Sequence, residues 1–169
     1  MDMSTKSAIS IEDYLRTSFE GLDREYVDGE IVERALTDEL QSKTQWRLSG
    51  LIWDLSKTLP FHGRTELRSR VRATRVRIPD VSIYAGAEPT ERVPTKPPLV
   101  AIEILSPDDR HSELMRKFEE YSAWGVPHIW LVDPESRKLN VYADGTLSEV
   151  SALTIPEFDV QLTGAGIFG

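Results

Sequence analysis

The sequence LVAIEIL, residues 99–105, is apolar at every position except Glu103. A run of this kind predicts a central strand that is buried on both faces of a sheet. A buried carboxylate is costly unless it is paired, protonated or bound to a cation. Two interpretations of Glu103 therefore stay open: a buried salt bridge to one of the arginines, or a cation that it shares with Asp80.

The residues that follow this strand predict a helix and then a second buried strand. Ser106 suits the N-cap of the helix and Pro107 suits its first position, and Gly125 ends it. The apolar side of this helix consists of Leu114, Phe118, Tyr121 and Trp124. The apolar stretch 128–132 comes next. This order predicts a right-handed crossover between two parallel strands.

Earlier in the chain, turn and helix signals are clear. Ser10 is a candidate cap for a short first helix, and Asp28-Gly29 between apolar pairs predicts a hairpin turn. Apolar residues at three- and four-residue spacing predict a long helix over 39–59, which we expect to pack on the sheet. Two antiparallel strands are predicted over 64–71 and 75–84, before a loop that is rich in proline.

The final part of the chain predicts further strands. Residues 139–142 predict an edge strand, Asp144-Gly145 a turn into another strand, and residues from 155 onward a tail with one short apolar segment. Taken together, the elements predict an α/β fold, more closely an α+β arrangement, in which a mixed central sheet carries helices on its faces.

Composition limits the kinds of site that this chain can form. With 169 residues, 40% of them hydrophobic, the chain is long enough to bury a sizeable core. It has no Cys, and its three His lie far apart, so a metal would be held by oxygen ligands, which favours magnesium, manganese or calcium. Its N-terminus lacks the pattern of a signal peptide, and no apolar run approaches the ~18 residues of a membrane span. We therefore expect a cytoplasmic protein with no membrane partner.

Asp80 and Glu103 together predict a particular chemistry. Asp80 follows Pro79 at the start of an alternating stretch, so it is either a turn residue or a carboxylate that projects into a cleft. Magnesium takes only one or two carboxylates from a protein. It neutralises phosphate charge and activates water, and a nearby Lys stabilises the developing charge. Two acids on neighbouring strands, with Lys117 close by, therefore predict a site that hydrolyses phosphodiesters.

These residues occur within motifs that resemble a known family. The motifs are EYVDGE (25–30), RIPDV (77–81), VAIEILSP (100–107), Lys117 through Tyr121 to GVP (125–127), and IWLVDP (129–134). In this order and spacing the chain resembles the Uma-type restriction endonuclease family of the PD-(D/E)XK nuclease superfamily. The resemblance implies one restriction-endonuclease-like domain over residues 1–169. Within it, residues 10–34 form an N-terminal helix and hairpin, 39–142 the nuclease core, and 143–169 C-terminal strands and a tail.

The resemblance also implies roles for particular residues. Asp80 and Glu103 would bind Mg²⁺, or Mn²⁺ in its place. The superfamily's Lys normally lies two residues after the strand acid, where this chain has Leu105, so Lys117 on the following helix would take its role. Glu25 matches a family acid and would be a third ligand, the holder of a metal-bound water, or a hairpin-edge acid. Gln45 would contact a metal-bound water or a phosphate, or lie on the surface.

Arginines are concentrated in a short stretch of this acidic chain. The formal net charge is −8, whereas proteins that bind nucleic acids are more often basic. We expect a face that binds the DNA backbone, or alternatively an exposed strand face paired with acids. Its members would be Arg68, Arg70, Arg72, Arg75 and Arg77.

Three functions fit the sequence. The first is a metal-dependent DNA endonuclease, which by resemblance would act as a homodimer because two strands need two sites. The second is a catalytically inactive nuclease-fold module that binds nucleic acid or a protein partner. The third is a structural oligomer subunit with Trp124, Trp130 and a sheet edge in its interface. The first two differ in whether Lys117 reaches the carboxylates.

Overall fold

The computed structural model describes residues 8–169. Its helices are α1 (Ile11–Arg16), α2 (Glu39–Ser56), α3 (His111–Trp124) and α4 (Gly164–Phe168), with a 3₁₀ turn at Pro156–Phe158. Its longer sheet consists of β3 (Phe61–Thr65), β6 (Val81–Ala85), β7 (Val100–Ile104), β8 (His128–Asp133), β9 (Lys138–Ala143) and β10 (Thr146–Val150). The remaining strands are β1 (Glu25–Val27), β2 (Glu30–Val32), β4 (Ser69–Arg72), β5 (Arg75–Arg77), β11 (Ala152–Ile155) and β12 (Val160–Thr163).

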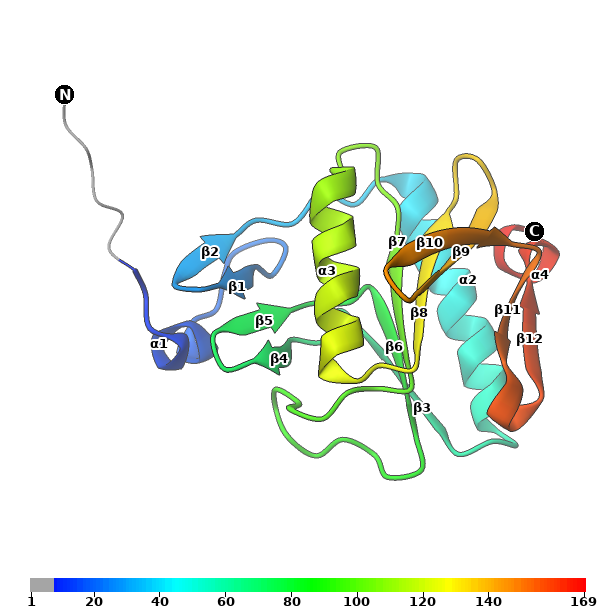
Figure 1. The fold of residues 1–169 in the computed structure, drawn as a ribbon, viewed down its shortest axis with the longest axis horizontal. Coiled ribbons are helices and arrows are strands. Elements are labelled where there is room, and N and C mark those ends of the chain that lie inside the picture. Colours follow the sequence, from blue (N-terminus) through cyan, green and yellow to red (C-terminus); the bar gives the residue numbers. More distant parts are fainter. Residues whose placement is uncertain (1–7) are drawn as a thin grey trace.

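The six-stranded sheet forms the centre of the structure (Figure 1). Its order is β10-β9-β8-β7-β6-β3, and β7 pairs parallel with β8 but antiparallel with β6. A four-stranded sheet has the order β2-β1-β5-β4, and β11 and β12 form a separate hairpin. The predicted class, a mixed central sheet flanked by helices, is confirmed.

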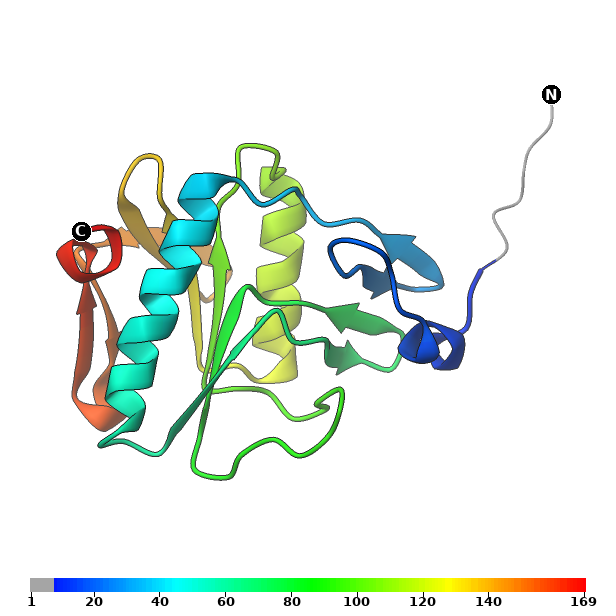
Figure 2. The same cartoon turned by 180° about the vertical axis from the view of Figure 1, so that it is seen from behind.

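Helices α2 and α3 cover opposite faces of the central sheet (Figures 1 and 2). Side chains alternate between the two faces along β7. Val100, Ile102 and Ile104 share one buried cluster with residues of α2, whereas Ala101 belongs to a second cluster with residues of α3. By the same alternation Glu103 lies on the α3 face. The predicted strand over 99–105 is thus central and fully buried, as its apolar sequence requires.

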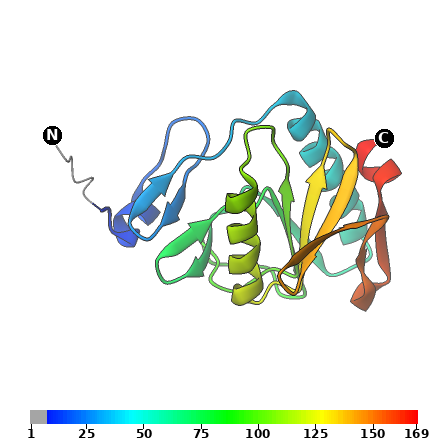
Figure 3. The ribbon, with the colours of Figure 1, turned by 45° about the horizontal axis from the view of Figure 1, so that its top comes forward.

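The smaller sheet lies at the N-terminal end of the structure. In Figure 3 the β1–β2 hairpin (blue) and the β4–β5 hairpin (green) lie on the opposite side of α3 from the C-terminal hairpin (orange to red). The predicted hairpin turn is confirmed, since Asp28 and Gly29 have φ values of 49° and 97°, as a type I′ turn requires. The long helix predicted over 39–59 is confirmed as α2, which begins after its cap Asp38 but ends earlier, at Ser56.

Four predictions need correction. The two strands expected over 64–71 and 75–84 are four, divided between two sheets. Residues 66–68, where Glu66 adopts a positive φ of 50°, separate β3 from β4, and residues 78–80, which include Pro79, separate β5 from β6. Helix α3 begins at His111, because Ser106 and Asp109 close a turn first: Asp109 Oδ2 accepts a hydrogen bond from the Ser106 N–H at 2.7 Å.

The other two corrections concern the sheet edge and the aromatic residues. The strand expected as an edge over 139–142 is β9, but β10 lies outside it. Trp130 is only 1% exposed and lies in the core, so it cannot serve the interface expected of it. Among residues 8–169, no helix is both long and apolar enough to cross a membrane.

Candidate active site

Asp80 and Glu103 meet at the end of two neighbouring strands. Val81 of β6 pairs with Ile102 of β7, so the antiparallel register sets Asp80 opposite Glu103. The Asp80 side chain turns toward β7, where its Oδ2 accepts a hydrogen bond from the Ile104 N–H at 2.7 Å. Both carboxylates are buried, with exposed fractions of 8% and 5%. The fold therefore places two acids together in a poorly solvated position.

Lys117 reaches this position from α3. Its Nζ lies 3.6 Å from Glu103 Oε2 and 3.1 Å from Glu25 Oε1. The predicted reach of Lys117 back to the strand end is confirmed for Glu103, although no ion pair joins Lys117 to Asp80. Tyr121, one helical turn further along α3, donates a hydrogen bond from its hydroxyl to Glu103 Oε1 at 2.6 Å. Helix α3 thus holds both oxygens of Glu103.

Glu25 belongs to a buried ion cluster beside the two acids. Its Oε1 accepts a hydrogen bond from the Ile78 N–H, and its Oε2 accepts one from Arg77 at 2.9 Å. Arg77 is fully buried and also pairs with Glu113 and Glu120. Both oxygens of Glu25 are therefore engaged within the protein, and one of them contacts Lys117.

The environment of the two strand acids disfavours their charged forms. Burial raises the pKa of Glu103 to about 7; Lys117 opposes this shift, while Asp80 and Glu25 add to it. Burial also raises the pKa of Asp80, against the Ile104 N–H and a nearby arginine. A bound cation would stabilise the charged carboxylate forms and so lower both pKa values.

Glu25 and Lys117 behave differently from the strand acids. Burial alone would raise the pKa of Glu25, but Lys117 and Arg77 hold it below its ordinary value. Burial alone would lower the pKa of Lys117, but Glu103 and Glu25 outweigh it, so the pKa of Lys117 is raised. Lys117 therefore stays protonated at neutral pH and acts as a hydrogen-bond donor rather than as a base.

The donor set fits a hard divalent cation such as Mg²⁺. Asp80 and Glu103 offer two carboxylates, and magnesium needs one or two from a protein because it keeps several waters. Within residues 8–169 no group of three or more His, Asp or Glu side chains is arranged to hold a metal. The side-chain oxygen of Gln41, which lines the same hollow, is buried and lacks a hydrogen-bond partner in the described chain. It is a further acceptor available to a hydrated ion.

Sequence reasoning missed Arg34, which lies in the segment between β2 and α2. Its Nη2 donates a hydrogen bond to Asp80 Oδ1 at 3.1 Å and lies 3.6 Å from Glu66. The side chain is only 9% exposed, and its Nη1 is a buried donor with no partner among residues 8–169. The Arg34 guanidinium thus combines a positive charge and a free donor at the candidate site. An isolated Arg after a hairpin gives no signal in the sequence.

Gln41 and Gln45 connect α2 to the strand ends. Gln41 donates from its amide to the Ile104 carbonyl at 2.9 Å, and Gln45 donates to the Asp80 carbonyl at 3.0 Å. Gln45 therefore fixes the backbone at Asp80.

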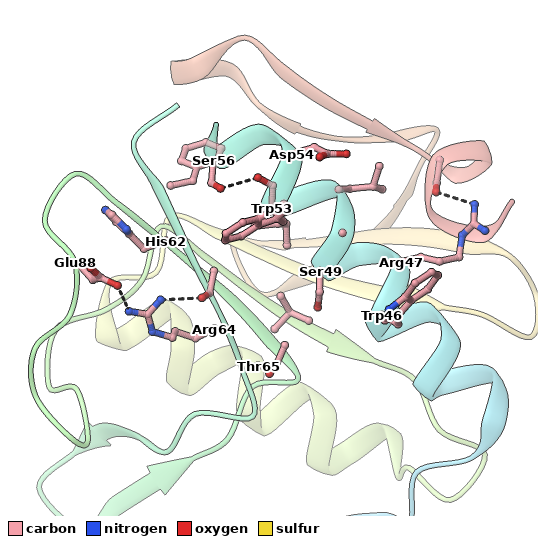
Figure 4. Close-up of a pocket in the computed structure, with 17 residues that line it drawn as sticks. Trp46, Arg47, Ser49, Trp53, Asp54, Ser56, His62, Arg64, Thr65 and Glu88 are labelled. Atoms are coloured by element: carbon pink, nitrogen blue, oxygen red, sulfur yellow. Dashed lines mark hydrogen bonds and ion pairs between the residues drawn. The ribbon is translucent and has the colours of Figure 1, made fainter. Parts of the chain in front are cut away.

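The hollow that contains these residues has a volume of about 580 Å³. A larger hollow of about 1080 Å³ lies elsewhere, between α2 and β3 (Figure 4). We assign the chemistry to the smaller one, because only it is lined by Asp80, Glu103 and Lys117.

The expected basic face does not form as a single surface. Arg77 is fully buried among acids, Arg75 pairs with Glu120 and Asp28, and Arg68 pairs with Asp23. Burial therefore corrects the prediction for Arg77, which cannot contact DNA, whereas DNA contact by Arg68 and Arg75, partly exposed and paired with acids, stays a prediction. Arg72 is exposed, and Arg70 is partly exposed and donates a hydrogen bond to the Ala73 carbonyl.

We expect Glu103→Gln to stabilise the metal-free protein above pH 7 and to have little effect below pH 4.5. The folded pKa of Glu103, about 7, exceeds its ordinary value of 4.5, so the folded state binds the proton more tightly. The stabilisation from this tighter proton binding is complete below pH 4.5 and is lost as the pH rises through 7. The gain at high pH should be of the order of 1–3 kcal/mol by urea unfolding in chelator.

The exposed Glu119 on the same helix provides the control, as Glu119→Gln should change stability little at either pH. A loss of stability in Glu103→Gln above pH 7 would contradict the raised pKa of Glu103.

Comparison with solved structures defines the class of the fold. The chain is similar to a protein of the DUF820 group from Anabaena variabilis, itself described as "a putative nuclease", with 20% identity and a TM-score of 0.82. The match covers 95% of this chain and 97% of the other. The fold is therefore that of the restriction-endonuclease-like nucleases. Residues 11–165 match the Uma2 family, described as "Putative restriction endonuclease", and the chain belongs to that family.

Two other comparisons add little. The chain has 16% identity and a TM-score of 0.38 to a cryo-electron-microscopy structure of a DrdV–DNA complex, over 77% of this chain and 13% of the other, a likeness too low to support an inference. No curated protein matches the chain. The resemblance found in the sequence motifs is confirmed at the level of family and fold.

Proposed function

We propose that the protein is a Mg²⁺-dependent endonuclease that hydrolyses phosphodiester bonds in DNA. The observation that carries the proposal is the meeting of Asp80 and Glu103 at neighbouring strand ends, with Lys117 Nζ 3.6 Å from Glu103. Membership of a restriction endonuclease family supports the substrate class. Asp80 and Glu103 would hold the cation, with Mn²⁺ as a possible substitute.

Each residue around the two acids would then have a distinct task. When bound, the cation would neutralise phosphate charge and activate the attacking water. Lys117, which stays protonated, would donate a hydrogen bond to the phosphate as negative charge develops. Glu25 would position Lys117 through their 3.1 Å contact. The free donor of Arg34 would bind a non-bridging phosphate oxygen.

The test is cleavage of supercoiled and linear DNA by the full chain with Mg²⁺, with Mn²⁺, or with chelator. The proposal expects cleavage that depends on either metal and stops in chelator. A folded protein that cuts none of these substrates with either metal would contradict it.

Lys117→Met should lower the cleavage rate by about 10²–10³-fold, the usual cost of removing one donor from a developing negative charge. Magnesium affinity should be retained, since the two carboxylates are unchanged. Lys138→Met is the matched control, because Lys138 is 53% exposed and, among residues 8–169, pairs with Glu149 alone. Equal cleavage rates in the two variants would remove Lys117 from the mechanism.

One observation favours a second candidate, a non-catalytic module of the nuclease fold. Asp80 already pairs with Arg34, and Glu103 already contacts Lys117, so side-chain cations partly fill the place of a metal. Such a module would bind DNA equally well with Mg²⁺ or with chelator and would not cut it. The cleavage assay above separates the two candidates.

A further inference from the structure

The hollow between α2 and β3 has two features that the proposed nuclease does not use (Figure 4). The first is a pair of exposed aromatic side chains, Trp46 and Trp53, which are 76% and 69% exposed. They lie seven residues apart on α2, which brings them to the same side of the helix about 10.5 Å apart along its axis. Gly50 lies between them, and nothing would come within 4 Å of a Cβ added there. Exposed aromatic residues grouped in this way are typical of an interface.

The second feature is an open strand edge beside these tryptophans. Strand β3 is last in the central sheet, and no strand in the described part of the chain pairs with its outer edge. The Gly63 carbonyl accepts a hydrogen bond from its neighbour Arg64 at 2.9 Å instead of from a strand. Helix α2 lies close over β3, since a Cβ on Gly63 would come 3.0 Å from Ile52 Cγ2. Unpaired backbone groups of this kind accept a strand from another chain.

The charges in the hollow favour a second copy over a nucleic acid. Arg64 already pairs with Glu88, and Asp54 with Lys57. Arg47 donates to two carbonyls of α4, so the hollow offers no free basic surface of the kind that binds phosphate. A face whose charges are neutralised within the chain can approach an identical copy across a two-fold axis without net repulsion. A two-fold axis also suits β3, because two copies of one strand pair antiparallel around such an axis.

We propose that a second copy of the chain docks here, with β3 antiparallel to β3 of the partner about Gly63. In this arrangement Trp46 and Trp53 pack across the axis, and the six-stranded sheet continues into the partner. The observations that support this docking face, which consists of Trp46, Trp53 and the outer edge of β3, are independent of catalysis. It also extends the proposed function, because it would join two candidate sites in one particle for the two strands of DNA.

The first test is the molar mass of the full chain in chelator and without DNA, measured by sedimentation over a range of concentrations. The wild type should be a dimer. The W46A/W53A variant should dimerise at least about thirtyfold more weakly, as expected for two interface tryptophans. Leu36→Ala is the matched control, since Leu36 is 75% exposed but does not line the hollow.

The outcomes are separable. A wild type that is monomeric throughout, or a dimer that the tryptophan variant leaves unchanged, would overturn the proposal. It would also be overturned if W46A/W53A lost binding of a single-stranded oligonucleotide with no change in mass. Asp80→Asn should dimerise like the wild type, so a failure of the nuclease proposal leaves this result intact.

A cross-linking experiment tests the strand register. The chain has no Cys, so the two cysteines of an H62C/R64C variant are its only thiols. Any disulfide that forms must therefore join these positions. Pairing about Gly63 sets position 62 opposite position 64 of the partner, within disulfide reach. Oxidation should therefore cross-link the dimer. A dimer that forms but does not cross-link would overturn the strand-to-strand geometry.

Discussion

Replacing Asp80 by Asn should lower the rate of DNA cleavage by about a thousandfold, equivalent to about 4 kcal/mol of transition-state stabilisation. Asn removes one of the only two carboxylates that would hold the cation. The amide oxygen can still accept the Ile104 N–H at 2.7 Å, so the fold should be retained. The measurement is the single-turnover cleavage rate in excess Mg²⁺, with the folded state verified by its unfolding transition.

The matched control for this variant is Asp108→Asn. Asp108 is an exposed acid that lines the same hollow but contacts neither carboxylate. It should cleave at nearly the wild-type rate. A similar loss in both variants would show that general negative charge, rather than a cation held by Asp80, governs the rate.

Arg77→Met should destabilise the protein by about 3–5 kcal/mol, the usual cost of removing one partner from a buried ion pair. Arg77 is fully buried and is the common partner of Glu25, Glu113 and Glu120. Met fills a similar space but leaves their negative charge uncompensated. The loss should appear in the free energy of unfolding measured with urea, where the variant unfolds at much lower denaturant than the wild type.

Arg72→Met is the control for this measurement, because Arg72 is exposed on the neighbouring strand. It should change stability by no more than about 0.5 kcal/mol. If Arg77→Met were equally mild, the cluster around Glu25 would not hold the fold, and the positioning of Lys117 would need another explanation.

The parts of the fold that sequence predicts are those with strong local signals. The apolar run of β7, the periodicity of α2 and the Asp28-Gly29 turn each specify one conformation. The region from β3 to β6 could not be predicted, because its strands alternate only weakly and exchange partners between two sheets. Such an exchange depends on tertiary packing that no local pattern records.

The same distinction explains the site. Glu103 could be predicted from the sequence, because an acid in a buried strand requires a partner, whereas the part given to Lys117 came from the family resemblance. The role of Arg77 could not, since a buried arginine and an exposed one look alike in a strand sequence. Arg34 reaches Asp80, and Tyr121 reaches Glu103, from separate elements, so only the fold brings them together.

The central claim is that Asp80 and Glu103 bind one magnesium ion together. Calorimetric titration of the full chain with Mg²⁺ at neutral pH, beside Asp80→Asn and Glu103→Gln, tests it most directly. The account predicts binding to the wild type that disappears in both variants, with DNA cleavage lost in parallel. Binding that persists in either variant, or no binding by the wild type with or without DNA, would contradict it.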